Sequence, residues 1–264
     1  MGVLSDKSRQ LSKAFGRRNV IIPNFITILG LLSGVYSIML SVSEKENSFI
    51  YAAYFLVLAA IFDGLDGKVA RLVNGTSDFG IQLDSLCDLV SFGVAPAILM
   101  YEWVLKPLDR VGVMAVFLFV ACGALRLARF NVQAGKISNA YFVGLPIPGA
   151  AAFIAASVLF LDAMRVYLGE YADHSNLSIF FLISTYFLGF LMVSSIPFFS
   201  FKRMNYFKEH PFRTLVFMII IISIFVLKFE IFFFVSIVVY ITVNIFIYLI
   251  RLLRMKKVEN SQNI

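Results

Sequence analysis

Residues 63–88 read DGLDGKVARLVNGTSDFGIQLDSLCD, and they join the polar ends of two long apolar runs, 49–66 and 81–104. Four acids fall at these ends: Asp63, Asp66, Asp84 and Asp88. Consecutive apolar runs of this length predict antiparallel membrane helices, so the acidic ends meet at one side of the bilayer. Ionisable groups within membrane spans are costly, and four of them together indicate a functional site.

The spacing of the acids predicts how they point. Asp63 and Asp66 are three residues apart, and Asp84 and Asp88 are four apart, so each pair shares one face of a helix. Four unpaired carboxylates in a region of low dielectric repel one another, and bound divalent cations make the arrangement stable. Ligation by oxygen alone favours Mg²⁺ or Mn²⁺ over zinc.

Small residues and one cation surround the acids. Gly67 and Gly80 carry no side chain where a substrate has to come close, and Arg71 supplies a fixed positive charge able to hold phosphate. Carboxylates, divalent metal and arginine together are typical of active sites for phosphoryl or phosphatidyl transfer.

The composition of the whole chain supports a membrane protein. Of 264 residues, 60% are hydrophobic and only 15% are charged, which excludes an ordinary soluble enzyme. We predict an all-α integral membrane protein. Its expected spans are 21–42, 49–66, 81–104, 112–130, 146–166, 178–200, 213–229 and 231–252, with six spans and a loose hairpin as the alternative for the last two.

Charge predicts the orientation. With the N-terminus inside, 18 of the 23 Lys and Arg residues fall in inner segments, so both termini are expected in the cytoplasm. The net charge of +7 is explained by topology and anionic headgroups, and no nucleic-acid partner is expected. The first apolar run is too long for a signal peptide and is expected to be retained. Cys87 and Cys122 are expected to be buried and reduced, and His174 and His210 to lie on the surface.

The quoted stretch resembles the signature of the CDP-alcohol phosphotransferase family at every defining position. The resemblance implies a six-helix catalytic core, usually dimeric, which cleaves a CDP-linked lipid and passes the phosphatidyl unit to an alcohol with release of CMP. We expect a basic N-terminal segment, this core, accessory membrane helices without a matching motif, and a cytoplasmic tail, over residues 1–20, 21–203, 204–255 and 256–264.

The resemblance also implies roles for residues. Asp63, Asp66 and Asp84 would bind metal, and Asp88 would contact metal and act as general base on the acceptor hydroxyl. The CDP-lipid would be held by Asn24, Thr27, Gly67, Arg71, Ser77 and Gly80. For Asn24 and Thr27, hydrogen bonds within the first span are an equal alternative.

Further segments between about residues 20 and 203 are similar to the membrane-spanning phosphatidylserine synthase branch of this family. They include PNFIT at 23–27, SFGVAP at 91–96, RLARFN at 126–131, GLPIP at 144–148 and SFK at 200–202. Residues 196–198, Ile-Pro-Phe, depart from the expected polar pattern. This resemblance implies CDP-diacylglycerol and L-serine as substrates and the cell membrane as location, with the active site facing the cytoplasm.

The residues give an independent argument for serine. Arg126 and Arg129 are three residues apart on one helix face, and paired guanidinium groups suit the acceptor carboxylate. Asn131 and Lys202 are expected to join them, whereas membrane anchoring is the alternative role for the basic residues. Glycerol phosphate, inositol phosphate or an ether-lipid donor would use the same chemistry. An ion-coupled transporter is the alternative from another class.

Overall fold

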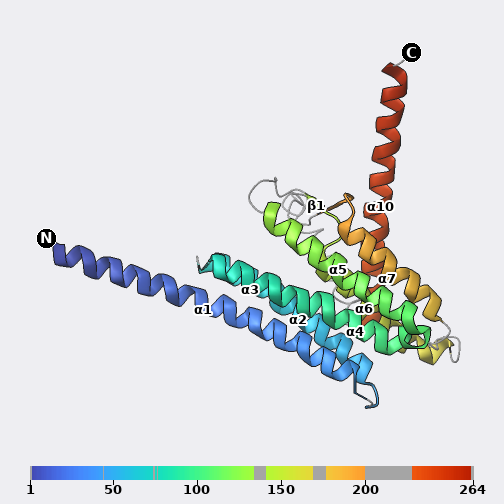
Figure 1. The fold of residues 1–264 in the computed structure, drawn as a ribbon, viewed down its shortest axis with the longest axis horizontal. Coiled ribbons are helices and arrows are strands. Elements are labelled where there is room, and N and C mark those ends of the chain that lie inside the picture. Colours follow the sequence, from blue (N-terminus) through green and yellow to red (C-terminus); the bar gives the residue numbers. More distant parts are fainter. Residues whose placement is uncertain are drawn as a thin grey trace, which may run out of the picture.

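The part of the chain that the structure describes is almost entirely helical (Figure 1). A computed structural model describes residues 2–43, 45–73, 75, 77–133, 141–168, 177–199 and 228–262. Within these ranges, five helical segments are long and apolar enough to cross a membrane. Large apolar side chains face outward from them, such as Phe117, which is 68% exposed. The predicted class, an all-α integral membrane protein, is therefore confirmed.

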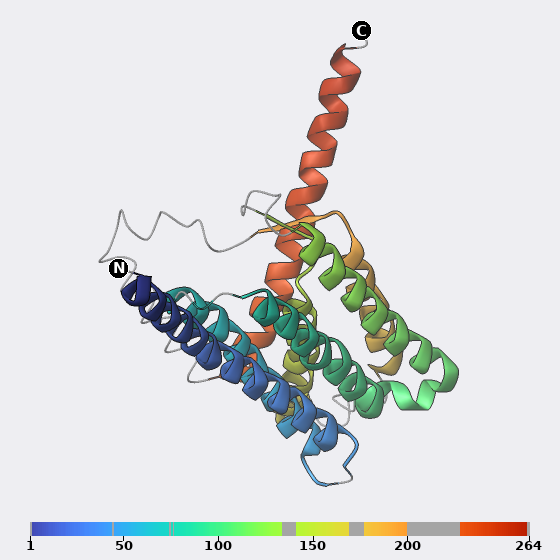
Figure 2. The same cartoon turned by 60° about the vertical axis from the view of Figure 1, so that its left-hand side comes forward.

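The first two helices pack along each other (Figures 1 and 2). Helix α1 is Gly2–Ser41, with its apolar part at Val20–Ser41, and α2 is Ser48–Leu72. Close approach is allowed by small residues: Ala52 and Ala53 are fully buried, and the Ser37 hydroxyl donates a hydrogen bond to the Ala52 carbonyl at 2.8 Å. Helix α2 continues past the predicted end at residue 66, so Arg71 lies on its last turn.

The third predicted span is one helical segment with two widened turns. Helix α3 (Asp78–Asp88) continues through the π-helix η1 (Leu89–Val94), α4 (Ala95–Met100), the π-helix η2 (Tyr101–Leu105) and the 3₁₀ turn η3 (Lys106–Leu108). A π turn precedes each proline, Pro96 and Pro107, because proline has no N–H for the normal helical bond and its ring needs room. The chain then reverses at Asp109, whose φ is 51°.

The remaining described helices are α5 (Asp109–Gln133), α6 (Ile147–Leu168), α7 (Ser178–Val193) and α10 (Phe229–Gln262). Helices α5, α6 and α10 correspond to the predicted spans 112–130, 146–166 and 231–252, in that order. Helix α7 stops earlier than the predicted end at 200. The predicted span 213–229 lies, apart from its last residues, outside the described part, as do Lys202, His174 and His210.

A short two-stranded sheet replaces the end of the predicted sixth span. Strand β1 (Tyr141–Val143) pairs antiparallel with β2 (Pro197–Phe199). Gly144, with φ of 82°, donates its N–H to the Ile196 carbonyl at 2.9 Å and turns the chain into α6. Pro197 and Phe198, from the segment that departs from the expected polar pattern, thus lie in strand β2, and Ile196 directly precedes it. The pairing of β1 with β2 brings the start of α6 close to the end of α7 at one end of the bundle.

The C-terminal helix α10 packs on α6 with its first turns, while its last turns project away from the bundle (Figures 1 and 2). The Phe234 ring stacks on Phe160 of α6 with centroids 4.4 Å apart. Cys87 and Cys122 are buried and unpaired, as expected.

Candidate active site

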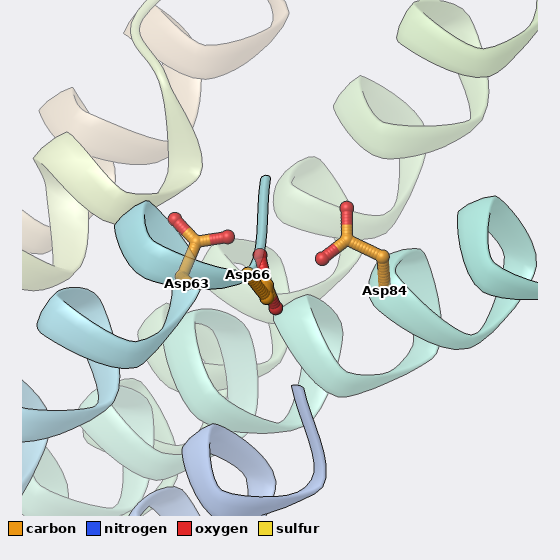
Figure 3. Close-up of side chains that lie close together, drawn as sticks. All are labelled: Asp63, Asp66 and Asp84. Atoms are coloured by element: carbon orange, nitrogen blue, oxygen red, sulfur yellow. The ribbon is translucent and has the colours of Figure 1, made fainter. Parts of the chain in front are cut away.

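Three carboxylates, two from α2 and one from α3, lie close together (Figure 3). Asp63 and Asp66 come from α2 and Asp84 from α3, and each offers an oxygen within 4.8 Å of the others. Asp66 is buried, and the other two are half-buried. Antiparallel helices with acids at three- and four-residue spacing bring these side chains together, as the sequence predicts.

The fourth acid, Asp88, lines the same small cavity as the other three. It is the last residue of α3, directly before the π-helix η1, and it interacts electrostatically with Asp63 and Asp84. Within the described residues, no Lys or Arg comes within 4.0 Å of these four carboxylates. The cluster therefore concentrates negative charge that no ion pair within the described part of the chain neutralises.

This geometry fits a divalent cation. Carboxylate oxygens a few ångströms apart are the donors that hard divalent ions take in proteins, and the ion removes the repulsion among the acids. The residues present can therefore hold a metal ion.

Thr27 of α1 contacts this cluster directly. Its hydroxyl lies 2.6 Å from Asp66 Oδ2 and 3.1 Å from the Pro23 carbonyl, and it is buried. One hydroxyl hydrogen can go to either acceptor, and the shorter distance favours the carboxylate. Thr27 thus fixes the orientation of a candidate metal ligand, a role that the sequence did not indicate.

A larger cavity of about 410 Å³ opens beside the acids. Two of the acids, Asp66 and Asp84, belong to its wall. All six residues expected to hold the CDP-lipid line it as well: Asn24, Thr27, Gly67, Arg71, Ser77 and Gly80. The structure therefore brings together, around one space, residues from three helices that are up to 56 positions apart in the sequence.

The start of α3 forms one wall of this cavity. Ser77 caps the helix, since its hydroxyl accepts the Gly80 N–H at 3.0 Å. A Cβ atom on Gly80 would lie 3.1 Å from Asn24 Oδ1, so glycine permits the close approach of α1. The positive end of the helix dipole faces the cavity here and favours a negatively charged group.

Gly67 leaves open space in the wall of the cavity because it has no side chain. A Cβ atom at this position would meet no described atom within 4 Å, and Gly67 lines the cavity. Arg71, one turn later, is exposed, and its Nε–H donates to the Gly67 carbonyl at 2.9 Å. Arg71 also lines the cavity.

Arg126 of α5 is buried, with 8% of its surface exposed, and it interacts electrostatically with Asp88. Among the described residues, its Nε–H has no hydrogen-bond partner. A buried guanidinium donor without an acceptor is costly, which indicates a place for an anionic group.

Arg129, one turn after Arg126, has a different environment. Its guanidinium donates to four backbone carbonyls, at Val143 (2.8 Å), Val193 (2.9 Å), Met192 (3.0 Å) and Ser194 (3.4 Å). It therefore joins α5 to β1 and to the end of α7, where helix carbonyls lack partners. The sequence pattern did not reveal these contacts, because backbone acceptors leave no trace in residue identity.

Asn131 reaches the acid-bearing helix. Its Nδ2 donates to the Ser85 hydroxyl at 2.9 Å, and Ser85 stands between Asp84 and Asp88 on α3. Ser85 is therefore a neighbour of the acid cluster. Lys202, the other residue expected in this part of the site, lies outside the described residues.

The chain is similar in sequence to known proteins. The family model of CDP-alcohol phosphatidyltransferase matches residues 20–193. A CDP-diacylglycerol--serine O-phosphatidyltransferase of Helicobacter pylori is 40% identical over 186 residues, 70% of this chain and 75% of the relative. One of the same name from Methanocaldococcus jannaschii is 37% identical over 182 residues, 69% of this chain and 75% of the relative. An archaetidylserine synthase of Methanothermobacter thermautotrophicus is 39% identical over 182 residues, covering 68% and 70%.

Proposed function

Because the chain belongs to the CDP-alcohol phosphatidyltransferase family, we propose that it is an enzyme that transfers the phosphatidyl group of CDP-diacylglycerol to L-serine. The products are phosphatidylserine and CMP. The observation that carries the proposal is the buried Arg126, whose guanidinium stands beside the acid cluster at Asp88 with an unpartnered Nε–H. An acceptor that brings its own carboxylate, as serine does, fits this place.

The metal of the proposed site is Mg²⁺ or Mn²⁺, held by Asp63, Asp66, Asp84 and Asp88. Three of these acids offer oxygens within 4.8 Å of one another, and all-oxygen ligation suits these ions. When bound, the metal supplies the positive charge that neutralises the diphosphate and the CMP leaving group.

The nucleotide part of the CDP-lipid is proposed to occupy the 410 Å³ cavity. Gly67 leaves room for it, Arg71 faces the phosphates, and the capped start of α3 at Ser77 and Gly80 adds a favourable dipole. Asn24 borders the same wall, and Thr27 acts there by orienting Asp66. The lipid tails then leave sideways between helices toward the bilayer.

In the proposed reaction, the serine hydroxyl oxygen attacks the lipid-proximal phosphorus in line with the bond to CMP. The new phosphorus–oxygen bond forms, the bond to CMP breaks, and Asp88 takes the hydroxyl proton. Arg126 holds the serine carboxylate, which aims the hydroxyl toward Asp88.

Three further residues were expected to bind serine. Asn131, tied to Ser85 between two of the acids, is placed to contact the amino acid. Arg129 donates to four backbone carbonyls, so we propose that it stabilises the serine pocket and does not contact serine directly. For Lys202 the proposal rests on the family resemblance alone.

We further propose that the site faces the cytoplasm in the cell membrane, with both termini on that side, because inner segments carry most of the Lys and Arg. Residues 21–203 form the catalytic core, flanked by the basic segment 1–20, accessory helices over 204–255 and a tail over 256–264. A homodimer is proposed on the family resemblance.

A direct test is to supply the purified protein with CDP-diacylglycerol and labelled serine and to identify the lipid product. Label in phosphatidylserine supports the proposal, whereas an unlabelled lipid fraction refutes it. The matched control is Asp88→Asn, which preserves shape but removes the base. We expect it to lose turnover while still binding the CDP-lipid, and wild-type turnover in this variant would remove Asp88 as base.

A further inference from the structure

Helix α10 carries no motif of the resemblance, yet its first half is docked on the catalytic core. The Phe234 ring lies against Phe153 and Phe160 of α6, at centroid distances of 5.9 Å and 4.4 Å. One turn earlier, Glu230 accepts a hydrogen bond from the Tyr54 hydroxyl of α2 at 3.2 Å. These contacts fix how α10 is rotated about its axis.

The same face of α10 continues to the short sheet. Ile241 and Asn244 are buried there, and the Tyr240 ring lies 5.9 Å from the ring of Phe198 in β2, at an interplanar angle of 43°. Phe198 is fully buried. Aromatic packing against Phe198 therefore holds the Tyr240 side chain at the edge of the hydrophobic core, so that this side chain contacts protein as well as lipid.

The sheet links Tyr240 to Arg126. Strand β2 pairs with β1, and the Val143 carbonyl of β1 accepts a hydrogen bond from Arg129 at 2.8 Å. Arg126 is three residues before Arg129 and so lies on the same face of α5, one turn closer to Asp88. In keeping with this placement, Tyr240 and Arg126 are near enough to interact electrostatically.

A phenol beside a buried guanidinium has a chemical use here. The Tyr hydroxyl is a hydrogen-bond donor, and so is the Nε–H of Arg126, which has no acceptor among the described residues. A carboxylate has two oxygens and accepts from both groups at once.

We propose that Tyr240 of α10 is an acceptor-binding residue, whose hydroxyl and the Arg126 guanidinium together hold the carboxylate of the acceptor amino acid. The inference rests on the proposed function and deepens it. It makes the C-terminal helix, expected from the sequence to be accessory, a part of the active site.

The test is Tyr240→Phe in the full-length protein, which removes the hydroxyl and keeps the ring against Phe198. Loss of one hydrogen bond should raise the KM for serine by about threefold to tenfold and leave the KM for CDP-diacylglycerol unchanged. Tyr248→Phe, two turns further along α10, is the matched control and should behave like wild type. An unchanged serine KM, or equal rises in both KM values, overturns the proposal.

A second acceptor separates binding of the carboxylate from general packing. Serinol has the hydroxyl and amine of serine but no carboxylate, so Tyr240→Phe should leave the CMP release supported by serinol at its wild-type rate. A loss of the same size with serinol and serine refutes the proposed contact. If wild type itself shows no serine-dependent CMP release, the proposed function fails with this inference. If wild type is active and Tyr240→Phe is unaffected, the inference alone fails.

Discussion

The guanidinium of Arg129 lies directly over Gly144. A Cβ atom on Gly144 would come within 2.7 Å of Arg129 Nη2 and would also clash with the Met192 carbonyl. The glycine, at φ of 82°, is thus required both by its backbone conformation and by the space that the arginine occupies. The two residues together hold the C-terminal ends of α5 and α7 against the start of α6.

Replacing Gly144 with alanine should therefore destabilise the protein. We expect the free energy of unfolding to fall by more than about 1 kcal/mol, because alanine is strained at this φ and displaces Arg129. Thermal unfolding in detergent measures the effect. Gly149→Ala, in the first turn of α6 where a Cβ meets only side-chain atoms at 3.5 Å or more, is the control and should be close to neutral.

Substitutions of Arg126 and Arg129 should have different effects on the kinetic constants. Arg126→Gln removes a charge-assisted contact to the acceptor and should raise the serine KM by about tenfold to hundredfold, with little change in the KM for CDP-diacylglycerol. Arg129→Lys should lower stability and kcat more than it changes the serine KM, since its partners are backbone carbonyls. Arg165→Gln, on an exposed position late in α6, is the control for loss of charge. Equal effects of Arg126→Gln on both KM values would assign Arg126 to packing.

Thr27→Val should weaken metal binding. Valine has nearly the same shape but cannot donate to Asp66, so we expect the metal concentration for half-maximal activity to rise by about tenfold to hundredfold. Thr242→Val on the exposed side of α10 is the isosteric control. An unchanged metal requirement would show that the hydroxyl does not position this ligand.

Gly67→Ala should block substrate without harming the fold. The added methyl group meets no described protein atom and favours the helix, so stability should hold or improve, while the KM for CDP-diacylglycerol should rise by about tenfold through overlap with the nucleotide. Gly64→Ala is a close control, because its Cβ also meets no described atom within 4 Å and Gly64 does not line the cavity. If both variants bind the CDP-lipid equally, the nucleotide does not pass over Gly67.

The acid cluster and the helices around it could be predicted from the sequence because their signals are local. Asp63 and Asp66 share a helix face by spacing alone, and apolar runs mark α5, α6 and the apolar part of α1, Val20–Ser41, within a few residues. The residues expected to hold the CDP-lipid were chosen by resemblance, and the structure adds that they line one cavity.

Other features depend on contacts that leave no local signal. Strands β1 and β2 have three residues each, and their pairing joins segments 54 or more positions apart, so the run to residue 200 resembled the end of a helix. Arg129 was read with Arg126 by spacing, although its acceptors are backbone carbonyls on other elements. Tyr240 is one of 11 tyrosines, and only the docking of α10 distinguishes it.

The central claim, metal-dependent transfer to serine, is tested most directly by CMP release from CDP-diacylglycerol with purified protein. The acceptors are serine, glycerol phosphate, inositol phosphate and none, each with and without a chelator of divalent metals. We predict release above the blank with serine alone, its loss with the chelator, and its return when Mg²⁺ or Mn²⁺ is restored. Release with another acceptor while serine stays at the blank, or full activity in the chelator, would contradict the account.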